Sequence, residues 1–208
     1  SWPKLLDGNE IDGPPLTIEF QSDTELRGQF EFRVDAIGVN GEIRAASIKF
    51  SSHSKAELRW ISQFFPKLRL LFLVDGVAGN GLSDLRELSQ LWGLLLAPVR
   101  PLESDKALLE WSELNALVQL KVLSVKNFMA PNDLSCCNEL IELERLEVRD
   151  ARSVRSLRGI ERCESLSSLT ITHANRLTKV SELETLRSLE SLELSQVNEL
   201  EVIPELCA

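Results

Sequence analysis

The sequence predicts an α/β solenoid, in which a curved parallel β-sheet lines the concave side and 3₁₀ or short-helical turns form the convex side. Two observations predict the repeats: triplets of the form L-x-x-L-x-[LIV] recur with a fixed spacing, and apolar residues stand at every third position between them. A third observation, an alternating segment followed by Asn-Gly, predicts a β-hairpin cap before the repeats. Self-similarity at a period of about 20 to 50 residues is the signature of a solenoid.

The triplets stand in strict register through the C-terminal half of the chain. They begin 23 residues apart, at Leu120, Leu143, Leu166 and Leu189. Two earlier triplets begin at Leu68 and Leu91, and a weaker one, a single repeat length before Leu68, consists of Ala45, Ile48 and Phe50. The step from Leu91 to Leu120 is longer than the others, which places six extra residues within an insertion near 98–114. Residues 43–208 are therefore predicted to form an array of about seven units.

Each unit is predicted to contain one short strand and one narrow turn. The L-x-[LIV] part of a triplet is the strand, and its two apolar side chains point into the core. Apolar residues at every third position fit a 3₁₀ turn or a short helix that brings the chain back to the next strand. The inward positions of these turns are Leu82, Leu85, Leu88, Leu134, Cys137, Leu140, Val154, Leu157, Ile160, Cys163, Leu177, Val180, Leu183 and Leu186.

Residues 1–42 are predicted to cap the first unit. Residues 16–20 are a short strand candidate, and residues 29–34 alternate apolar and polar side chains as a half-buried strand does. Asn40 and Gly41 offer a hairpin turn, after which residues 42–50 return as a strand. A solenoid needs such a cover because a terminal unit otherwise exposes its apolar side to water.

The triplets resemble those of leucine-rich repeat proteins, in which L-x-x-L-x-L marks the strand on the concave face, and the resemblance covers about residues 43–206. It implies a protein-interaction scaffold. The chain departs from the family at the position where members usually carry an asparagine that hydrogen-bonds between turns. That position holds His53, Gly76, Val99, Phe128, Ala151, Ala174 and Val197.

Composition excludes several classes of function. The formal net charge is −9 and the sequence pI about 4.9, so a phosphate-backbone binder is not expected and any charge-driven partner is expected to be basic. No apolar run approaches the ~20 residues that span a bilayer, and the first residues lack a secretory signal. Four cysteines without C-x-x-C spacing are expected to be reduced thiols. These features predict a cytoplasmic protein that binds neither nucleic acid nor membrane.

No catalytic constellation is visible in the sequence. His53 and His173 lie about five units apart, too far to share a site, and no known nucleotide, serine-hydrolase or zinc motif occurs. Cys136 and Cys137 have no basic neighbour that would depress a thiol pKa, so both are expected to be structural. The chain is accordingly predicted not to be an enzyme and to have no cofactor, metal ion or small-molecule substrate.

The predicted partner surface is the concave face of the sheet. Units two and three present an apolar group, which is either open to a partner or covered by the insertion near 98–114, and later units present mixed charges. The predicted contact residues are Phe72, Trp92, Leu95, Lys126, Arg145, Glu147, Arg149, Asp150, Glu190 and Glu193. The C-terminal stretch is acidic, with seven Glu against Arg187 alone between residues 181 and 208.

These features predict a non-catalytic protein-binding module. The sharper hypothesis is a cytoplasmic inhibitor, such as an immunity protein, that neutralises a basic partner such as a toxin nuclease. It draws on fold-level analogy with ribonuclease inhibitors. Two alternatives stay open: an adaptor or regulatory subunit of a larger complex, and an effector directed into a host cell.

Overall fold

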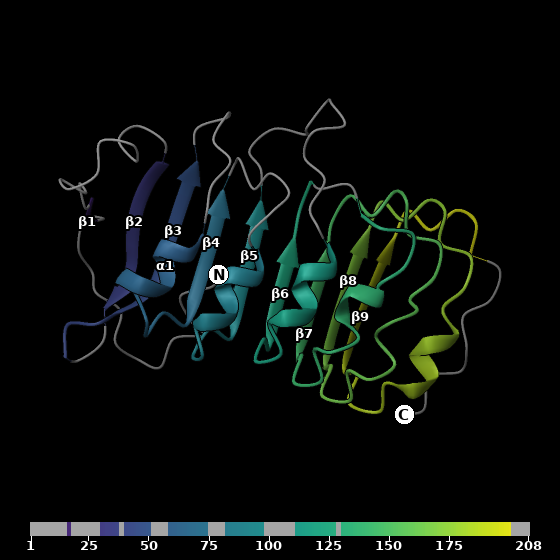
Figure 1. Cartoon of the computed structure of the whole chain (residues 1–208). Coiled ribbons are helices and arrows are strands. Elements are labelled where there is room, and N and C mark those ends of the chain that lie inside the picture. Colours follow the sequence, from purple (N-terminus) through teal and green to yellow (C-terminus); the bar gives the residue numbers. More distant parts are fainter. Residues whose placement is uncertain are drawn as a thin grey trace.

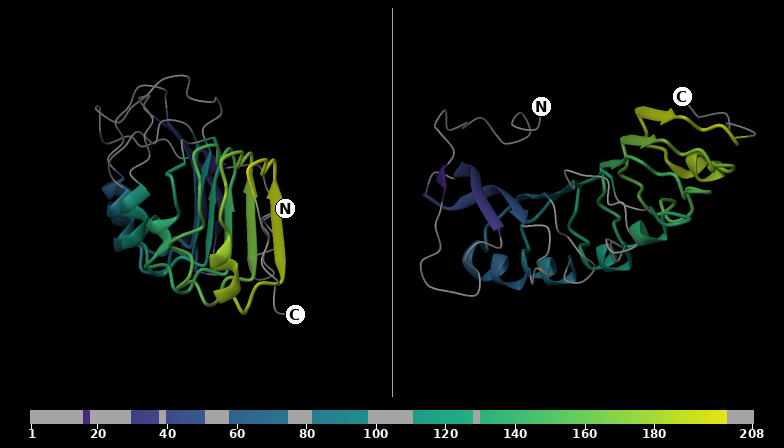
Figure 2. Two further views of the ribbon diagram at one scale, coloured as in Figure 1. Left: turned by 90° about the vertical axis from the view of Figure 1, so that its right-hand side faces the viewer. Right: turned by 90° about the horizontal axis from the view of Figure 1, so that it is seen from above.

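The described parts of the chain form one nine-stranded sheet whose strands follow in sequence order from β1 to β9 (Figure 1). The computed structural model describes residues 16–17, 30–37, 40–50, 58–74, 82–97, 111–127 and 130–200. Seen from above, the array is curved, with the strands along the inner side and the short helices along the outer side (Figure 2). The predicted α/β solenoid with a leucine-rich repeat fold is therefore confirmed.

The N-terminal strands form the predicted hairpin. β1 (Leu16–Thr17) pairs antiparallel with β2 (Phe30–Ile37), which pairs antiparallel with β3 (Ile43–Phe50). Gly41 closes the turn with a φ of +80°, which glycine adopts without strain. The sheet runs without a break through the predicted boundary between residues 42 and 43, because β3 is also the first strand of the parallel array.

Six further strands extend the parallel sheet. They are β4 (Leu70–Val74), β5 (Gly93–Ala97), β6 (Val122–Val125), β7 (Arg145–Val148), β8 (Ser168–Thr172) and β9 (Ser191–Ser195). Leu123 pairs with Leu146, and Leu146 with Leu169, so neighbouring strands are offset by one repeat length as predicted. The longer step between β5 and β6 is also confirmed, since Leu94 lies opposite Leu123.

The register predicted for the first unit is wrong. Ala46 pairs with Leu71 and Ile48 with Leu73, whereas the sequence pattern aligns Ile48 with Leu71. The first unit is thus two residues longer than the regular repeat, and its return contains an α-helix, α1 (Arg59–Phe64). As a result Ala45 points to the concave side, where it packs in a small cluster with Leu70.

The other helical returns are 3₁₀ helices on the convex side. They are η2 (Leu82–Glu87), η3 (Trp111–Ala116), η4 (Ser135–Cys137) and η5 (Ser181–Thr185). Only the last part of the predicted insertion lies in the described residues, where Trp111 and Leu114 are buried; residues 98–110 lie outside them. The fifth unit, from Leu143 to Ser165, returns through turns without a helix.

One continuous apolar core runs through the stacked units. Leu123, Leu146 and Leu169 have no exposed surface, and the inward positions predicted for the turns are all buried. Cys136 is buried as well, although the sequence pattern places only Cys137 inward. The core opens at its far end, where Leu192 and Leu194 of β9 are only half-buried.

The turns after the strands repeat a feature that the sequence analysis missed. Asn127, Asp150, His173 and Gln196 follow one another at the repeat length and adopt φ angles between 56° and 61°. Asparagine, aspartate and histidine are enriched in this left-handed region. In two units the next residue is an alanine, Ala151 or Ala174, which is fully buried. These alanines stand at the position where leucine-rich repeat proteins usually carry asparagine. A left-handed polar residue followed by a buried alanine thus makes the turn.

No helix in the described parts of the chain is long and apolar enough to cross a membrane.

Candidate functional site

The concave face is formed by the strand residues that alternate with the core leucines. Since successive side chains of a strand point to opposite faces, these residues line up across neighbouring strands in rows. From β4 to β9 the outward side chains change from apolar to charged and then to hydroxyl-bearing. We call these parts the apolar, charged and hydroxyl zones.

The apolar zone lies on β4 and β5. Phe72 and Trp92 are half-buried, whereas Leu95 is only 6% exposed, so Leu95 offers little surface to a partner. Leu70 packs under Trp92, and Gly93 leaves the space that the Leu70 side chain occupies. The two aromatic residues, with the half-buried Val74 of β4, are therefore the accessible apolar contacts of this zone.

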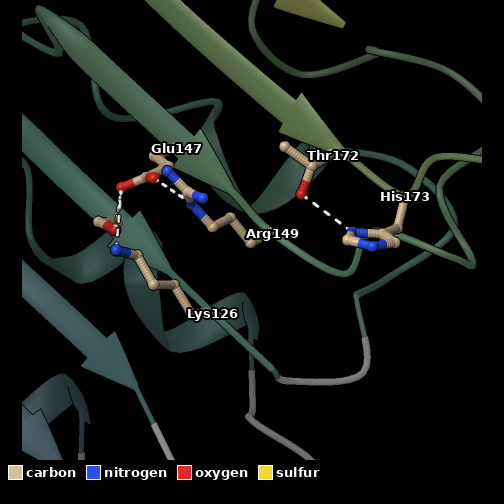
Figure 3. A network of polar contacts seen from close by, with 6 residues as sticks. Lys126, Glu147, Arg149, Thr172 and His173 are labelled. Carbon is tan, nitrogen blue, oxygen red and sulfur yellow. Dashed lines mark hydrogen bonds and ion pairs between the residues drawn. The ribbon is translucent and has the colours of Figure 1, made fainter. Parts of the chain in front are cut away.

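The charged zone is organised around Glu147 on β7 (Figure 3). The buried hydroxyl of Ser124 donates a 2.6 Å hydrogen bond to Glu147 Oε2, and Arg149 Nε donates to Oε1. Lys126 Nζ lies 3.7 Å from Oε2. Ser124 was absent from the predicted contact residues because a small hydroxyl among apolar strand positions gives no charge signal in the sequence.

The protein holds Glu147 in its ionised form. Burial by itself raises the pKa of this carboxyl, but hydrogen bonds from Ser124 and Arg149 and the charge of Lys126 outweigh burial and lower the pKa below its ordinary value. Arg145, exposed on the same strand, has no ion-pair partner in the described structure. Three cations against one carboxylate leave the charged zone with a positive balance.

The hydroxyl zone follows on β8 and β9. Its outward hydroxyl residues are Ser168, Thr170, Thr172, Ser191 and Ser195, and Glu193 stands between the last two. Thr172 Oγ1 lies 3.2 Å from His173 Nδ1, and the same nitrogen is 3.6 Å from Asp150 Oδ1. A catalytic histidine uses one nitrogen for its carboxylate and the other for its nucleophile. Here the same nitrogen of His173 contacts both the Thr172 hydroxyl and the Asp150 carboxylate, so these three residues do not form a proton relay.

Two predicted acidic contacts lie at the far end of the face. Glu193 is exposed on β9, and Glu190 is exposed just before it. Neither carboxylate forms an ion pair within the described residues. They stand two units beyond the charged zone, so the structure does not bring all the predicted contacts together in one patch.

The remaining reactive groups lie in the core. Cys136 and Cys137 have their sulfurs 3.8 Å apart, and Cys163 Sγ lies 3.6 Å from the Cys137 carbonyl. Burial, helped by Glu161 and Cys136, raises the pKa of Cys163 to about 12, and the contact with Cys136 together with burial raises the pKa of Cys137. Cys207 lies outside the described residues. No group of three His, Cys, Asp or Glu side chains that the structure describes could hold a metal ion.

The charge of the chain is unevenly distributed. Residues 145–179 carry eight Lys or Arg and four Asp or Glu, a net charge of +4 within a chain of −9. The remainder therefore carries −13, a contrast that the whole-chain charge conceals.

No family model matches the chain, and no curated protein sequence is significantly similar to it. Among solved structures, it is similar to an internalin C2 from Listeria monocytogenes, with 20% identity, a TM-score of 0.48 and coverage of 66% of this chain. An internalin (inlF) from the same organism matches with 16% identity, a TM-score of 0.30 and 67% coverage. The chain spans 56% and 57% of the length of these two proteins.

Proposed function

We propose that the chain is a non-catalytic protein-binding module whose concave face contacts the partner. The observation that carries this proposal is the row of outward side chains from β4 to β9, which offers aromatic, charged and hydroxyl groups on one continuous sheet. Aromatic residues are common binding hot spots, and paired charges contribute specificity and steering.

The face is pre-organised for binding. Its strands from β4 to β8 are held by ladder hydrogen bonds on both sides, and Glu147 is fixed by Ser124 and Arg149 before any partner arrives. A rigid surface loses little conformational entropy on association, which favours affinity. The same rigidity suits a scaffold better than an enzyme that must close over a substrate.

Within this class, we propose a cytoplasmic inhibitor of a basic protein, such as an immunity protein against a toxin nuclease. Two features support a basic partner: the net charge of −9 and the unpaired carboxylates of Glu190 and Glu193 at the end of the concave face. A basic partner would contact these carboxylates across the hydroxyl zone. Where it extends over the positive charged zone to the anchors Trp92 and Phe72, it would present acidic side chains of its own.

Affinity capture from the source cell tests this proposal. The wild-type chain should retain a basic protein that binds the purified chain directly. Trp92→Ala and the double variant Glu190→Lys/Glu193→Lys should each weaken that binding about tenfold or more. Glu164→Lys, which changes an exposed carboxylate outside the concave face, is the matched control and should leave binding unchanged.

Two results would contradict the proposal. A retained partner that is acidic would remove the inhibitor hypothesis but leave the binding module. Binding that tolerates all concave variants would show that the partner docks elsewhere.

An adaptor or regulatory subunit is the second candidate function. The observation that favours it is the net charge of +4 in residues 145–179, because a scaffold with two oppositely charged surfaces can hold two different partners.

A further inference from the structure

The fifth unit carries arginine at every third position on its outer surface. Residues 151–159 form three triplets, A-R-S, V-R-S and L-R-G, each with a fully buried apolar first residue. The second residues of the triplets are exposed arginines, and another exposed arginine follows three residues after the last triplet. We call these four residues the arginine stripe: Arg152, Arg155, Arg158 and Arg162.

The backbone of the stripe is fixed by both neighbouring units. Arg155 N donates to Asn132 O of the fourth unit at 2.8 Å, and Arg155 O accepts from Thr178 N of the sixth at 3.1 Å. Arg158 O accepts from Leu134 N at 2.8 Å. The arginine side chains therefore project from a rigid support.

The fold does not need arginine at these positions. The residues one repeat length before and after Arg155 are Asn132 and Thr178, and those around Arg158 are Ser135 and Ser181. All four are uncharged in units of the same architecture, so a small polar residue suffices for the turn. These uncharged neighbours provide no counter-charge to Arg155 or Arg158.

The central arginines of the stripe have no ionic partner among the described residues. Arg152 pairs with Asp150 at 3.5 Å and Arg162 with Glu139 at 3.2 Å. Arg155 and Arg158 form no side-chain ion pair or hydrogen bond within the part of the chain that the structure describes. Lys179 adds a further exposed cation close by, since it lies opposite Ser156 in a parallel bridge.

The charge outside the stripe limits the size of an anionic partner. In the neighbouring units, residues 130–144 and residues 180–200 each carry a net charge of −4, on the two sides of the segment of +4. A long polyanion, such as a nucleic acid or an anionic bilayer, would extend beyond the stripe and meet this negative charge. A short acidic segment would cover the stripe alone. At physiological ionic strength, negative charges of the protein that lie more than about 8 Å from this segment would be largely screened and would not repel it.

We infer that the arginine stripe is a docking site for a short acidic segment of a partner protein. Guanidinium groups bind carboxylates through paired hydrogen bonds, which a flexible ammonium group does not match. Arg152, Arg155 and Arg158 are three residues apart, at most about 11 Å between Cα atoms, and Arg162 follows four residues after Arg158. Carboxylates at a similar spacing therefore fit the stripe. The inference rests on the proposed function as a protein-binding module, and it adds a second surface on the convex side.

Binding of labelled peptides to the full chain tests the inference. The probe is (Glu-Gly-Ser)₄, and its neutral control is (Gln-Gly-Ser)₄. The wild-type chain should bind the acidic peptide at least tenfold more tightly than the neutral one, and added salt should weaken this binding. Arg155→Glu/Arg158→Glu should reduce the affinity at least tenfold.

The matched control is Lys67→Glu/Arg187→Glu, which makes the same change of net charge at two exposed cations outside the stripe. It should reduce the affinity less than threefold. All four positions are exposed, so unchanged thermal unfolding is expected and would show that the variants are folded.

Three outcomes would overturn the inference: equal binding of both peptides, equal losses in the two double variants, or tighter stripe-dependent binding of a 12-nucleotide single-stranded RNA or of phosphatidylserine vesicles. The concave variants Trp92→Ala and Glu190→Lys/Glu193→Lys separate this failure from failure of the proposed function. If they abolish partner capture while the stripe variants bind peptide like wild type, only the convex site is refuted.

Discussion

Gly159 is the residue on which the shape of the fifth unit depends, and replacing it with alanine should destabilise the protein strongly. Its φ is +111°, a conformation that side chains with a Cβ rarely adopt. A Cβ at this position would also overlap the backbone of Leu134 and Ser135 in the fourth unit. Both groups are main-chain atoms, so the clash can be relieved only by moving the two units apart.

The size of the effect follows from the contacts that such a movement disturbs. The conformational strain costs about 1–2 kcal/mol. Separation of the units lengthens the 2.8 Å bond from Leu134 N to Arg158 O, worth about 1 kcal/mol, and loosens the core around Leu157 and Ile160. We therefore expect a loss of about 3–4 kcal/mol in the free energy of unfolding.

Gly41→Ala is the matched control. Gly41 also has a positive φ, +80°, but a Cβ there would meet nothing within 4 Å. It should cost only the conformational strain, about 1–2 kcal/mol. Urea unfolding followed by circular dichroism measures both variants, and the difference should appear as a midpoint about 1 M lower for Gly159→Ala. Equal losses in the two variants would refute the close approach of the fourth and fifth units.

Three further results are expected. Ser124→Ala should lower the free energy of unfolding by about 1–2 kcal/mol at pH 7. The lowered pKa of Glu147 stabilises the fold only while this carboxyl is ionised, so the loss should shrink as pH falls below about 4. A pH-independent loss would contradict the hydrogen bond. Leu169→Ala, in the closed core, should cost about 3 kcal/mol in chemical unfolding and Leu192→Ala, at its half-buried end, about half as much. In a Cys207→Ser background, the three buried thiols should react with Ellman's reagent only on unfolding, and fast native labelling would contradict their burial.

The sequence predicted the elements that depend on strict periodicity. Leu123, Leu146 and Leu169 lie side by side because each unit adds the same number of residues, so counting along the chain locates them in space. The same counting failed at Ile48, because the first unit is two residues longer than the others and returns through an α-helix. Helical and 3₁₀ returns share an apolar spacing near three residues, and the pattern alone could not distinguish them.

The candidate site was less predictable because its properties depend on pairs of residues from different units. Glu147 was identified as a charged contact, but its hydrogen bond with Ser124 joins two strands from successive units. Likewise, the burial of Leu95 depends on the packing around it and not on its place in the triplet. The residues with left-handed backbone conformation could have been predicted from the sequence, since Asn127, Asp150 and His173 recur at the same position of the repeat.

The uneven charge connects the two proposed surfaces. A solenoid stacks its units in register, so a change confined to one unit produces a line of side chains across the molecule without disturbing its neighbours. In the fifth unit, Arg145 begins the concave strand and Arg149 directly follows it, and Arg155 and Arg158 place further cations on the outer turn. If the inferred convex site is correct, one unit contributes to both surfaces. A partner bound at the stripe would then change the electrostatic field that a partner on the concave face experiences. The affinity at one surface should therefore depend on occupancy of the other at low salt, and this dependence should disappear at high salt.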